Sequence, residues 1–274
     1  MIRSSFLVLL VWCCGIGCIE QEPAKENIRN PKATSTVAME TPNERPNRPK
    51  IDPEITIAYL MGQFDPSTHP DFTVIEGDFA NKEGMYLRKD AYEAFKKMAL
   101  DARQSGIYLQ IISATRPFDH QKRIWEAKWS GARKVDGQDL SKTIADPAER
   151  AIKILTYSSM PGTSRHHWGT DFDLNSLEPS YFESGTGKKI YEWLAANASD
   201  YGFCQPYNEK GEGRLFGYEE EKWHWSYLPV SKPLTDQYIL RINDGNLSGF
   251  RGSETAPDIY MIEKWVYGIN PTCK

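Results

Sequence analysis

The stretch Ser164 to Asp173 reads SRHHWGTDFD and places two histidines and two aspartates within ten residues. Imidazole and carboxylate groups cost free energy when they are buried without a partner, so this clustering needs a physical reason. Two interpretations are open at this point: a hydrogen-bonded polar turn, or part of a metal site. The other polar motifs of the chain decide between them.

A second motif, E-x-W-H at Glu221 to His224, supplies the donor types that a metal site still lacks. Catalytic zinc usually takes three protein ligands and leaves its fourth position to water. His166, Asp173 and His224 together offer two imidazoles and one carboxylate, a donor set that suits zinc. Gly169 allows the bend between the first two ligands. Glu221 precedes His224 by three residues and is a candidate general base. The pattern predicts one Zn²⁺ ion.

Each of these residues also has a structural interpretation. Asp173 alone suits a turn or a helix cap, and Glu221 ends the acidic run Glu219 to Glu221, which suits a solvated face. Trp223 suits an ordinary core. The joint pattern favours the metal site, because several independent coincidences would otherwise be required.

Helices and strands are expected where they can position these motifs. Apolar residues at three- and four-residue spacing predict a helix over 87–106, and an apolar run predicts a buried strand over 107–115. Arg116 follows at the end of this strand, and Pro117 opens a second helix that reaches 129. Further helices are expected over 146–159, which begins with an Asp-Pro cap, and over 188–202. The pattern is that of a single α+β domain.

The N-terminus is predicted to be a secretory signal over residues 1–18, with Arg3 followed by an apolar run and small residues. The tetrapeptide ending at Cys18 resembles a bacterial lipobox, although Gly15 stands where leucine is usual. Lipid anchoring through Cys18 and simple signal cleavage therefore both remain open. Residues 19–50 are rich in Pro, Asn, Glu and Lys and are expected to form a flexible linker. The folded domain is expected over 51–274.

Composition narrows the classes of partner. Net charge is −4 over 274 residues, which argues against a nucleic-acid-binding protein, since such proteins need a concentrated basic face. Only Cys204 and Cys273 lie outside the predicted signal. In an oxidising compartment this pair favours a disulfide over two free thiols.

Four ordered motifs between Tyr86 and Tyr227 resemble the VanY-type zinc D-alanyl-D-alanine carboxypeptidases, which belong to a wider group with lysostaphin-like peptidases and Hedgehog domains. The motifs read SATRPFDHQ, SSMPGTSRHHWGTDFDLN, NASDYGF and EEKWHWSY. The resemblance implies an α+β domain with a small antiparallel sheet flanked by helices. It also implies a peptidase that acts on peptidoglycan stem peptides.

The resemblance assigns roles to individual residues. It implies His166, Asp173 and His224 as the zinc ligands and Glu221 as the base that activates water. It implies that Arg116 stabilises the oxyanion that forms at the scissile carbonyl. Gln121 and Ser164 match positions that bind the C-terminal end of the substrate, and Trp223 is expected to contact substrate.

Three neighbouring positions need separate interpretation. Many relatives have alanine where this chain has Asp171, and arginine where it has Ser226. Asp171 is therefore expected either to orient a ligand or to form a salt bridge. His167 is expected to be a groove or packing residue, because adjacent side chains in an extended segment point in opposite directions.

The function expected from these observations is removal of the terminal D-alanine from stem peptides by an exported enzyme, periplasmic or anchored to a membrane. An L,D-carboxypeptidase or a peptidoglycan endopeptidase would use the same metal and base. A non-catalytic cell-wall-binding lipoprotein is the alternative from another class, but it would need neither Glu221 nor Arg116. The segment after Tyr227 is expected to be either a lid beside the groove or a structural closure of the domain.

Overall fold

The computed structural model describes residues 50–274. The predicted signal, Cys18 and the predicted linker up to residue 49 lie outside the described residues. Within the described part of the chain, no helix has both the length and the apolar character that a membrane span requires.

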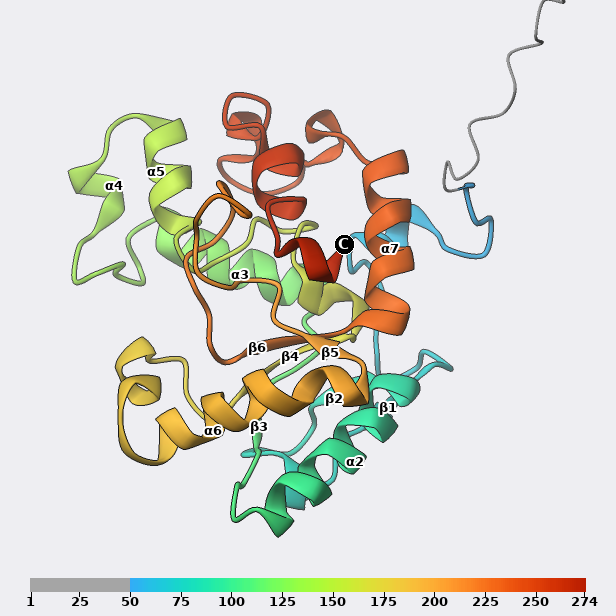
Figure 1. The fold of residues 1–274 in the computed structure, drawn as a ribbon. Coiled ribbons are helices and arrows are strands. Elements are labelled where there is room, and N and C mark those ends of the chain that lie inside the picture. The colour runs from blue at the N-terminus through green and yellow to red at the C-terminus, as the bar shows by residue number, and fades with distance from the viewer. Residues whose placement is uncertain (1–49) are drawn as a thin grey trace, which may run out of the picture. The chain divides into compact units, whose positions relative to one another are not determined.

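The centre of the domain is an antiparallel sheet of four short strands in the order β3-β4-β6-β5 (Figure 1). These strands are β3 (Ile111–Ser113), β4 (Asp171–Leu174), β5 (Phe203–Cys204) and β6 (His224–Tyr227). A separate antiparallel pair consists of β1 (Phe72–Val74) and β2 (Tyr86–Arg88). The two central strands, β4 and β6, come from the two polar motifs of the sequence.

Helices cover the sheet from two sides. Figure 1 shows α2 and α6 on one side, and α3, α5 and α7 with the C-terminal turns on the other. The helices are α1 (Ile57–Leu60), α2 (Lys89–Gln104), α3 (Phe118–Trp129), α4 (Leu140–Thr143), α5 (Pro147–Ile154), α6 (Gly185–Asn197) and α7 (Leu228–Arg241). The predicted α+β fold with a small antiparallel sheet flanked by helices is confirmed.

The strands β4 and β6 alternate between two environments, as the two-residue period of a strand requires. Phe172 and Trp225 point into the hydrophobic core that α2 and α6 complete. Asp171, Asp173 and His224 occupy the intervening positions and therefore face the other layer. The strand register pairs Asp173 with His224 and Asp171 with Ser226. The sheet thus gathers polar residues from both motifs on a single face.

The predicted helices exist, with shifted ends. The helix predicted over 87–106 begins at Lys89, because Leu87 and Arg88 belong to β2 and pair with β1. The helix predicted over 146–159 ends at Ile154, which leaves 155–159 as irregular chain, of which Tyr157, Ser158 and Ser159 line a cavity. The helix predicted over 188–202 begins at Gly185 and ends at Asn197, and a 3₁₀ turn follows.

The C-terminal segment completes a second hydrophobic core, which lies on the side of the sheet that α3 and α7 cover (Figure 1). Its apolar side chains, among them Leu234, Tyr238, Phe250 and Met261, pack with Trp125 of α3. Cys273 forms a disulfide with Cys204 of β5, as the sequence predicts, with a Cα–Cα distance of 5.8 Å. These contacts favour the structural interpretation of this segment over a lid.

Candidate metal centre and active site

Three buried side chains converge on the polar face of the sheet. His166 comes from the 3₁₀ turn η2 (Arg165–Trp168), Asp173 from β4 and His224 from β6. One donor atom from each lies within 4.8 Å of the other two. Asp173 Oδ1 lies 3.4 Å from His166 Nε2 and 3.2 Å from His224 Nδ1. The residues predicted as metal ligands therefore come together.

The geometry of this cluster fits zinc. Ligand bonds of about 2.0–2.1 Å in a tetrahedron place neighbouring donor atoms about 3.3 Å apart, close to the distances between Asp173 and the two histidines. Asp173 Oδ1 and His166 Nε2 are buried and have no hydrogen-bond partner among residues 50–274. Buried polar atoms almost always have a hydrogen-bond partner. A bound cation that both atoms coordinate would explain why these two have none.

His166 is held so that one ring nitrogen remains free. Its Nδ1 donates a hydrogen bond to the carbonyl oxygen of Ala114 at 2.9 Å, which leaves Nε2 directed at the cluster. Burial, reinforced by the charge of Arg116, lowers the pKa of His166 to about 4. The imidazole is therefore neutral at pH 7, the state in which histidine binds metal.

His224 is held in the same way through its other nitrogen. Its Nε2 lies 3.0 Å from Asp171 Oδ2 and donates to it, so Nδ1 faces the cluster. Asp171 Oδ2 also accepts from Arg165 Nε at 2.9 Å. Burial acts to raise the pKa of Asp171, but Arg165 and the bond from His224 outweigh it and keep the pKa below its usual range. Of the two alternatives for Asp171, the structure has both: an ion pair and a contact with a ligand.

Glu221 lies beside this cluster. Its side chain is 6% exposed, and its Oε2 lies 3.4 Å from His224 Nδ1. Burial raises the pKa of Glu221, although the neighbouring His224 acts in the opposite direction. A carboxylate with a raised pKa next to a metal site is well placed to accept and return a proton.

Arg116 reaches the same cavity from the end of β3. Its backbone NH donates to the carbonyl oxygen of His166 at 3.0 Å, which ties it to a ligand. Its Nη1 donates to Gln121 Oε1 at 3.1 Å, while Gln121 Nε2 donates to the carbonyl oxygen of Ser159. The Nε–H of Arg116 has no partner in the described part of the chain. Arg116 therefore presents a fixed cation with a free donor.

The cavity above the cluster has a volume of about 690 Å³. Its lining includes the three metal-cluster residues, Glu221, Arg116 and Trp223. Gln121 and Ser164 are buried and are not among its lining residues. Gln121 supports Arg116 from behind, and the hydroxyl of Ser164 has no partner within residues 50–274. Direct substrate contacts of both residues stay predictions.

His167 is separate from the cluster. Its Nδ1 donates to the carbonyl oxygen of Arg116, and its Nε2 accepts from the backbone NH of Gly162 at 3.0 Å. Both ring nitrogens are thus occupied by backbone. The structure places His167 as a buried packing residue, one of the two roles expected for it.

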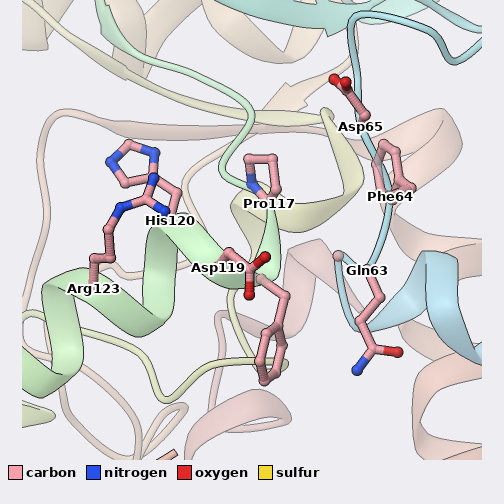
Figure 2. A pocket seen from close by; sticks show the side chains of 9 residues that line it. Gln63, Phe64, Asp65, Pro117, Asp119, His120 and Arg123 are labelled. Atoms are coloured by element: carbon pink, nitrogen blue, oxygen red, sulfur yellow. The ribbon is translucent and has the colours of Figure 1, made fainter.

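A second cavity of about 760 Å³ opens beside the first, between the loop Gly62–Asp65 and the first turns of α3. Figure 2 shows its lining, with His120 and Arg123 on α3 across from Phe64 and Asp65. His120 lines both cavities. None of the metal-cluster residues lines the second cavity, so it extends the surface around the site and takes no part in the metal centre.

A model of the family described as VanY, D-alanyl-D-alanine carboxypeptidase, matches residues 84–230. This range contains the metal cluster, Glu221 and Arg116. The chain belongs to the VanY family. Membership confirms the predicted resemblance to this carboxypeptidase family, and the His-Asp-His cluster is the predicted candidate metal site.

Curated relatives share part of their length with this VanY-family chain. It is 29% identical over 180 residues to the YodJ protein of Bacillus subtilis (strain 168), covering 62% of this chain and 56% of that protein. It is 30% identical over 129 residues to a D-alanyl-D-alanine carboxypeptidase of Enterococcus faecalis (strain ATCC 700802 / V583), covering 47% and 43% respectively. The chain spans about half the length of these relatives.

Solved structures are similar in part. VanYB in complex with D-Ala-D-Ala has a TM-score of 0.43 at 24% identity, covering 57% of this chain and 79% of that one. The L,D-carboxypeptidase LdcB has a TM-score of 0.46 at 23% identity, covering 72% and 79%.

The structure adds residues to the VanY-family site that the sequence interpretation missed. Tyr218 lines the cavity, and its buried hydroxyl has no partner in the described region. Lys128 and Ser158 line the cavity as well. Lys128 follows Gln121 by seven residues on α3, which is two helical turns, so this spacing was the available signal.

Proposed function

We propose that this chain is a zinc carboxypeptidase that removes the terminal D-alanine from peptidoglycan stem peptides. The observation that carries the proposal is the combination of the His166, Asp173 and His224 cluster with Glu221 and Arg116 in a single cavity. Family membership supports the same chemistry. A binding module would need neither a buried proton acceptor nor a cation with a free donor.

His166 would hold the zinc through Nε2, His224 through Nδ1 and Asp173 through Oδ1. The bound ion supplies Lewis-acid chemistry, which acidifies water and polarises a carbonyl group. Glu221 accepts a proton from the attacking water and returns it to the nitrogen of the leaving residue. Arg116 donates to the scissile carbonyl oxygen as negative charge develops there. Trp223 forms part of the wall against which the peptide lies.

Two further parts of the proposal concern place and specificity. The enzyme acts outside the cytoplasm, which is supported by the Cys204–Cys273 disulfide and by the family. A folded domain over 51–274, preceded by a signal and a linker, is part of the same proposal. An L,D-carboxypeptidase or an endopeptidase would use the same residues and differ in the peptide that the cavity admits.

The test is mass spectrometry of defined muropeptides after incubation with the zinc-loaded protein. Loss of one terminal D-alanine from a pentapeptide stem is expected, and zinc removal or Glu221→Gln should abolish it. If only tetrapeptides are trimmed, the enzyme is an L,D-carboxypeptidase. If cross-links are cut, it is an endopeptidase. No change in any muropeptide by a zinc-loaded protein would refute the enzyme proposal.

A further inference from the structure

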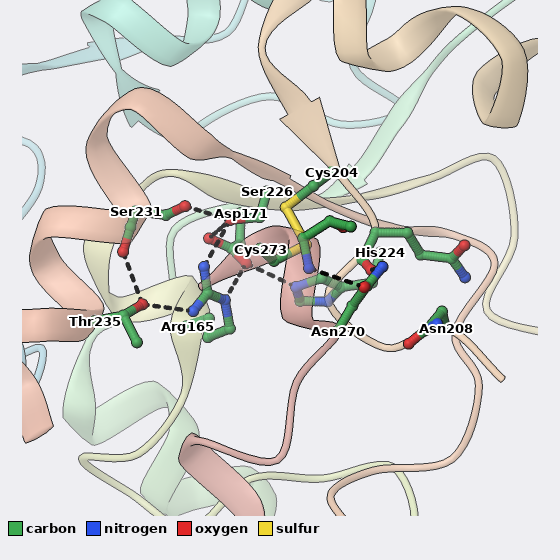
Figure 3. Close-up of a disulfide and its surroundings, with 12 residues drawn as sticks. Arg165, Asp171, Cys204, Asn208, His224, Ser226, Ser231, Thr235, Asn270 and Cys273 are labelled. Atoms are coloured by element: carbon green, nitrogen blue, oxygen red, sulfur yellow. Dashed lines mark hydrogen bonds and ion pairs between the residues drawn. A yellow bond between two sulfur atoms is a disulfide. The ribbon is translucent and has the colours of Figure 1, made fainter. Parts of the chain in front are cut away.

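An ion pair lies buried behind the metal cluster. Arg165 is 1% exposed and Asp171 is 0% exposed, and their Nε and Oδ2 atoms are 2.9 Å apart. The other guanidinium nitrogens of Arg165 donate to Thr235 Oγ1 on α7 at 2.9 Å and to Ser226 Oγ on β6 at 2.8 Å. Figure 3 shows this network next to the disulfide.

Burying two charges costs free energy that their attraction often fails to recover, so such a pair is weak evidence for stability alone. Asp171 Oδ2 accepts from Arg165 and from His224 Nε2, whereas Oδ1 accepts from Thr170 and Ser226. These four hydrogen bonds fix the orientation of the Asp171 carboxylate. Because its Oδ2 accepts from His224 Nε2, the proton of a neutral His224 must lie on Nε2. The ring consequently presents Nδ1 toward Asp173.

We infer that Asp171 and Arg165 are positioning residues that fix the tautomer and orientation of His224 for zinc binding. The inference rests on the proposed zinc site. A purely structural role, in which the pair only ties α7 to the sheet, is the competing explanation.

The experiment separates these roles by measuring zinc affinity and apo-protein stability in the same variants. Asp171→Ala leaves Arg165 buried without a counter-ion, so both the melting temperature and zinc affinity should fall. In the double variant Asp171→Ala/Arg165→Met no unpaired charge remains, so the melting temperature should recover. Zinc affinity should nevertheless stay roughly 10- to 100-fold below wild type, the usual effect of losing a partner of a ligand.

Thr235→Val is the matched control, because Thr235 contacts Arg165 without contacting His224. It should lower stability slightly and leave zinc affinity near the wild-type value. Wild-type zinc affinity in the double variant would overturn the inference. Should the variants not fold, nitrogen-15 NMR of the zinc-free wild type at alkaline pH decides: a neutral His224 with its proton on Nε2 supports the inference, and one with its proton on Nδ1 overturns it. Zinc binding is measured without peptide, so failure of the proposed peptidase activity is recognised separately.

A second inference rests on the charges of the cavity wall. Arg116, Lys128, Arg133 and Lys134 all line the cavity. None of these four side chains forms an ion pair with a residue of the range 50–274, whereas the neighbouring Asp136 is paired with Lys153. The acidic lining residues besides Asp136 are the cluster residues Asp173 and Glu221, and Glu178.

Lys128 is one of the cations in this wall. It is half-buried, and its Nζ donates to Ser158 Oγ, which also lines the cavity. Burial, together with the charges of Arg133 and Arg116, lowers the pKa of Lys128 to about 8. An anion placed here would gain charge-assisted hydrogen bonds and relieve the repulsion among the cations.

We propose that Lys128 and Ser158 form a subsite for a carboxylate group of the substrate peptide. The carboxylate comes either from the C-terminus of the peptide or from an acidic side chain near the scissile bond. The proposal rests on the proposed function and deepens it by specifying a carboxylate group that the substrate peptide must carry.

The test measures peptide binding by calorimetry in the Glu221→Gln background, so that no peptide is consumed. Three peptides are compared: the free acid, its C-terminal amide, and a version with the side-chain carboxylate amidated. Lys128→Met should weaken binding of the free acid roughly tenfold or more, and should have no effect on whichever amide lacks the recognised carboxylate. Lys188→Met is the control, because Lys188 pairs with Glu192 on α6 and does not line the cavity.

An equal effect of Lys128→Met on all three peptides would overturn the subsite, as would no effect or no binding of any peptide. Binding without hydrolysis by the active enzyme would instead contradict only the proposed peptidase function.

Discussion

At the residue scale, the site depends on which atom of each side chain is left free. His166 uses Nδ1 on the carbonyl oxygen of Ala114, and His224 uses Nε2 on Asp171, so opposite ring nitrogens face Asp173. His167, adjacent to His166, has both nitrogens bound to backbone groups. Three histidines close in space therefore have different chemistry because their hydrogen-bond partners differ.

Glu221→Gln should separate catalysis from metal binding. The amide keeps the shape of the side chain but cannot accept and return a proton, so kcat should fall by roughly 10²- to 10⁴-fold. Zinc affinity should remain close to wild type, since Glu221 is not among the three residues of the metal cluster. Steady-state kinetics and a chelator competition assay measure the two quantities. A variant that retains wild-type kcat would exclude Glu221 as the base.

The pH dependence of substrate affinity should follow the protonation state of Lys128. Its pKa is lowered to about 8, so the ammonium is present below that pH and is lost above it. Affinity for a peptide with a recognised carboxylate should therefore decrease as the pH rises through about 8. Calorimetric titrations of the Glu221→Gln protein between neutral and alkaline pH measure this. The inflection should be missing in Glu221→Gln/Lys128→Met, and its persistence there would assign it to another group.

At the element scale, two strands and one tight turn bring the cluster together. The alternation along β4 and β6 sends Asp173 and His224 to one face and Phe172 and Trp225 to the other. The turn η2 precedes β4 and ends at Trp168, and its C-cap residue Gly169 has φ +70°. A shift of one residue in either strand would put the ligands into the hydrophobic core.

Gly169→Ala should disturb the metal centre through this turn. A Cβ atom there would lie 2.3 Å from Phe72 Cε1, in addition to the strain of a positive φ. We expect a lower melting temperature and weaker zinc binding. Gly106→Ala is the matched control, because Gly106 has φ +75° with no atom within 4 Å of the added Cβ. Equal losses in the two variants would show that backbone strain alone matters and that the contact with Phe72 does not.

At the scale of the whole molecule, the C-terminal segment completes a core that the family-matched region does not contain by itself. The family match ends at residue 230, yet Tyr238, Met261 and Val266 are buried with Trp125. The Cys204–Cys273 disulfide links the two parts across 69 residues.

Removing this link with Cys204→Ser/Cys273→Ser should lower the free energy of unfolding by about 2–4 kcal/mol, because the unfolded chain regains conformational freedom. Urea denaturation with circular dichroism measures the change. The wild-type protein in reductant is the control and should lose a similar amount. If the urea midpoints of the double variant and of the reduced wild type both equal that of the oxidised wild type, the disulfide does not contribute to stability.

Zinc removal should act on the entire fold. A ligand that binds only the folded state at 100 times its Kd adds about 2.7 kcal/mol of stability. Thermal unfolding should therefore shift upward when zinc is added to the chelator-treated protein. His166→Ala lacks one ligand and should show a much smaller shift. An equal rise in melting temperature in the wild type and in His166→Ala would show that the stabilising zinc binds at a site without His166.

Local sequence patterns determined the residue types of the candidate metal site, Glu221 beside it, the helix-forming segments and the pair of cysteines. They are readable because donor chemistry, helical periodicity and capping depend on residues close together in the chain. Tertiary structure alone decided which ring nitrogens face Asp173, the Arg165–Asp171 pair, and the place of Lys128 in the cavity wall. These features depend on contacts between residues far apart in the chain. Asp171 meets His224 because β4 pairs with β6, and Arg165 meets Thr235 because α7 packs against η2.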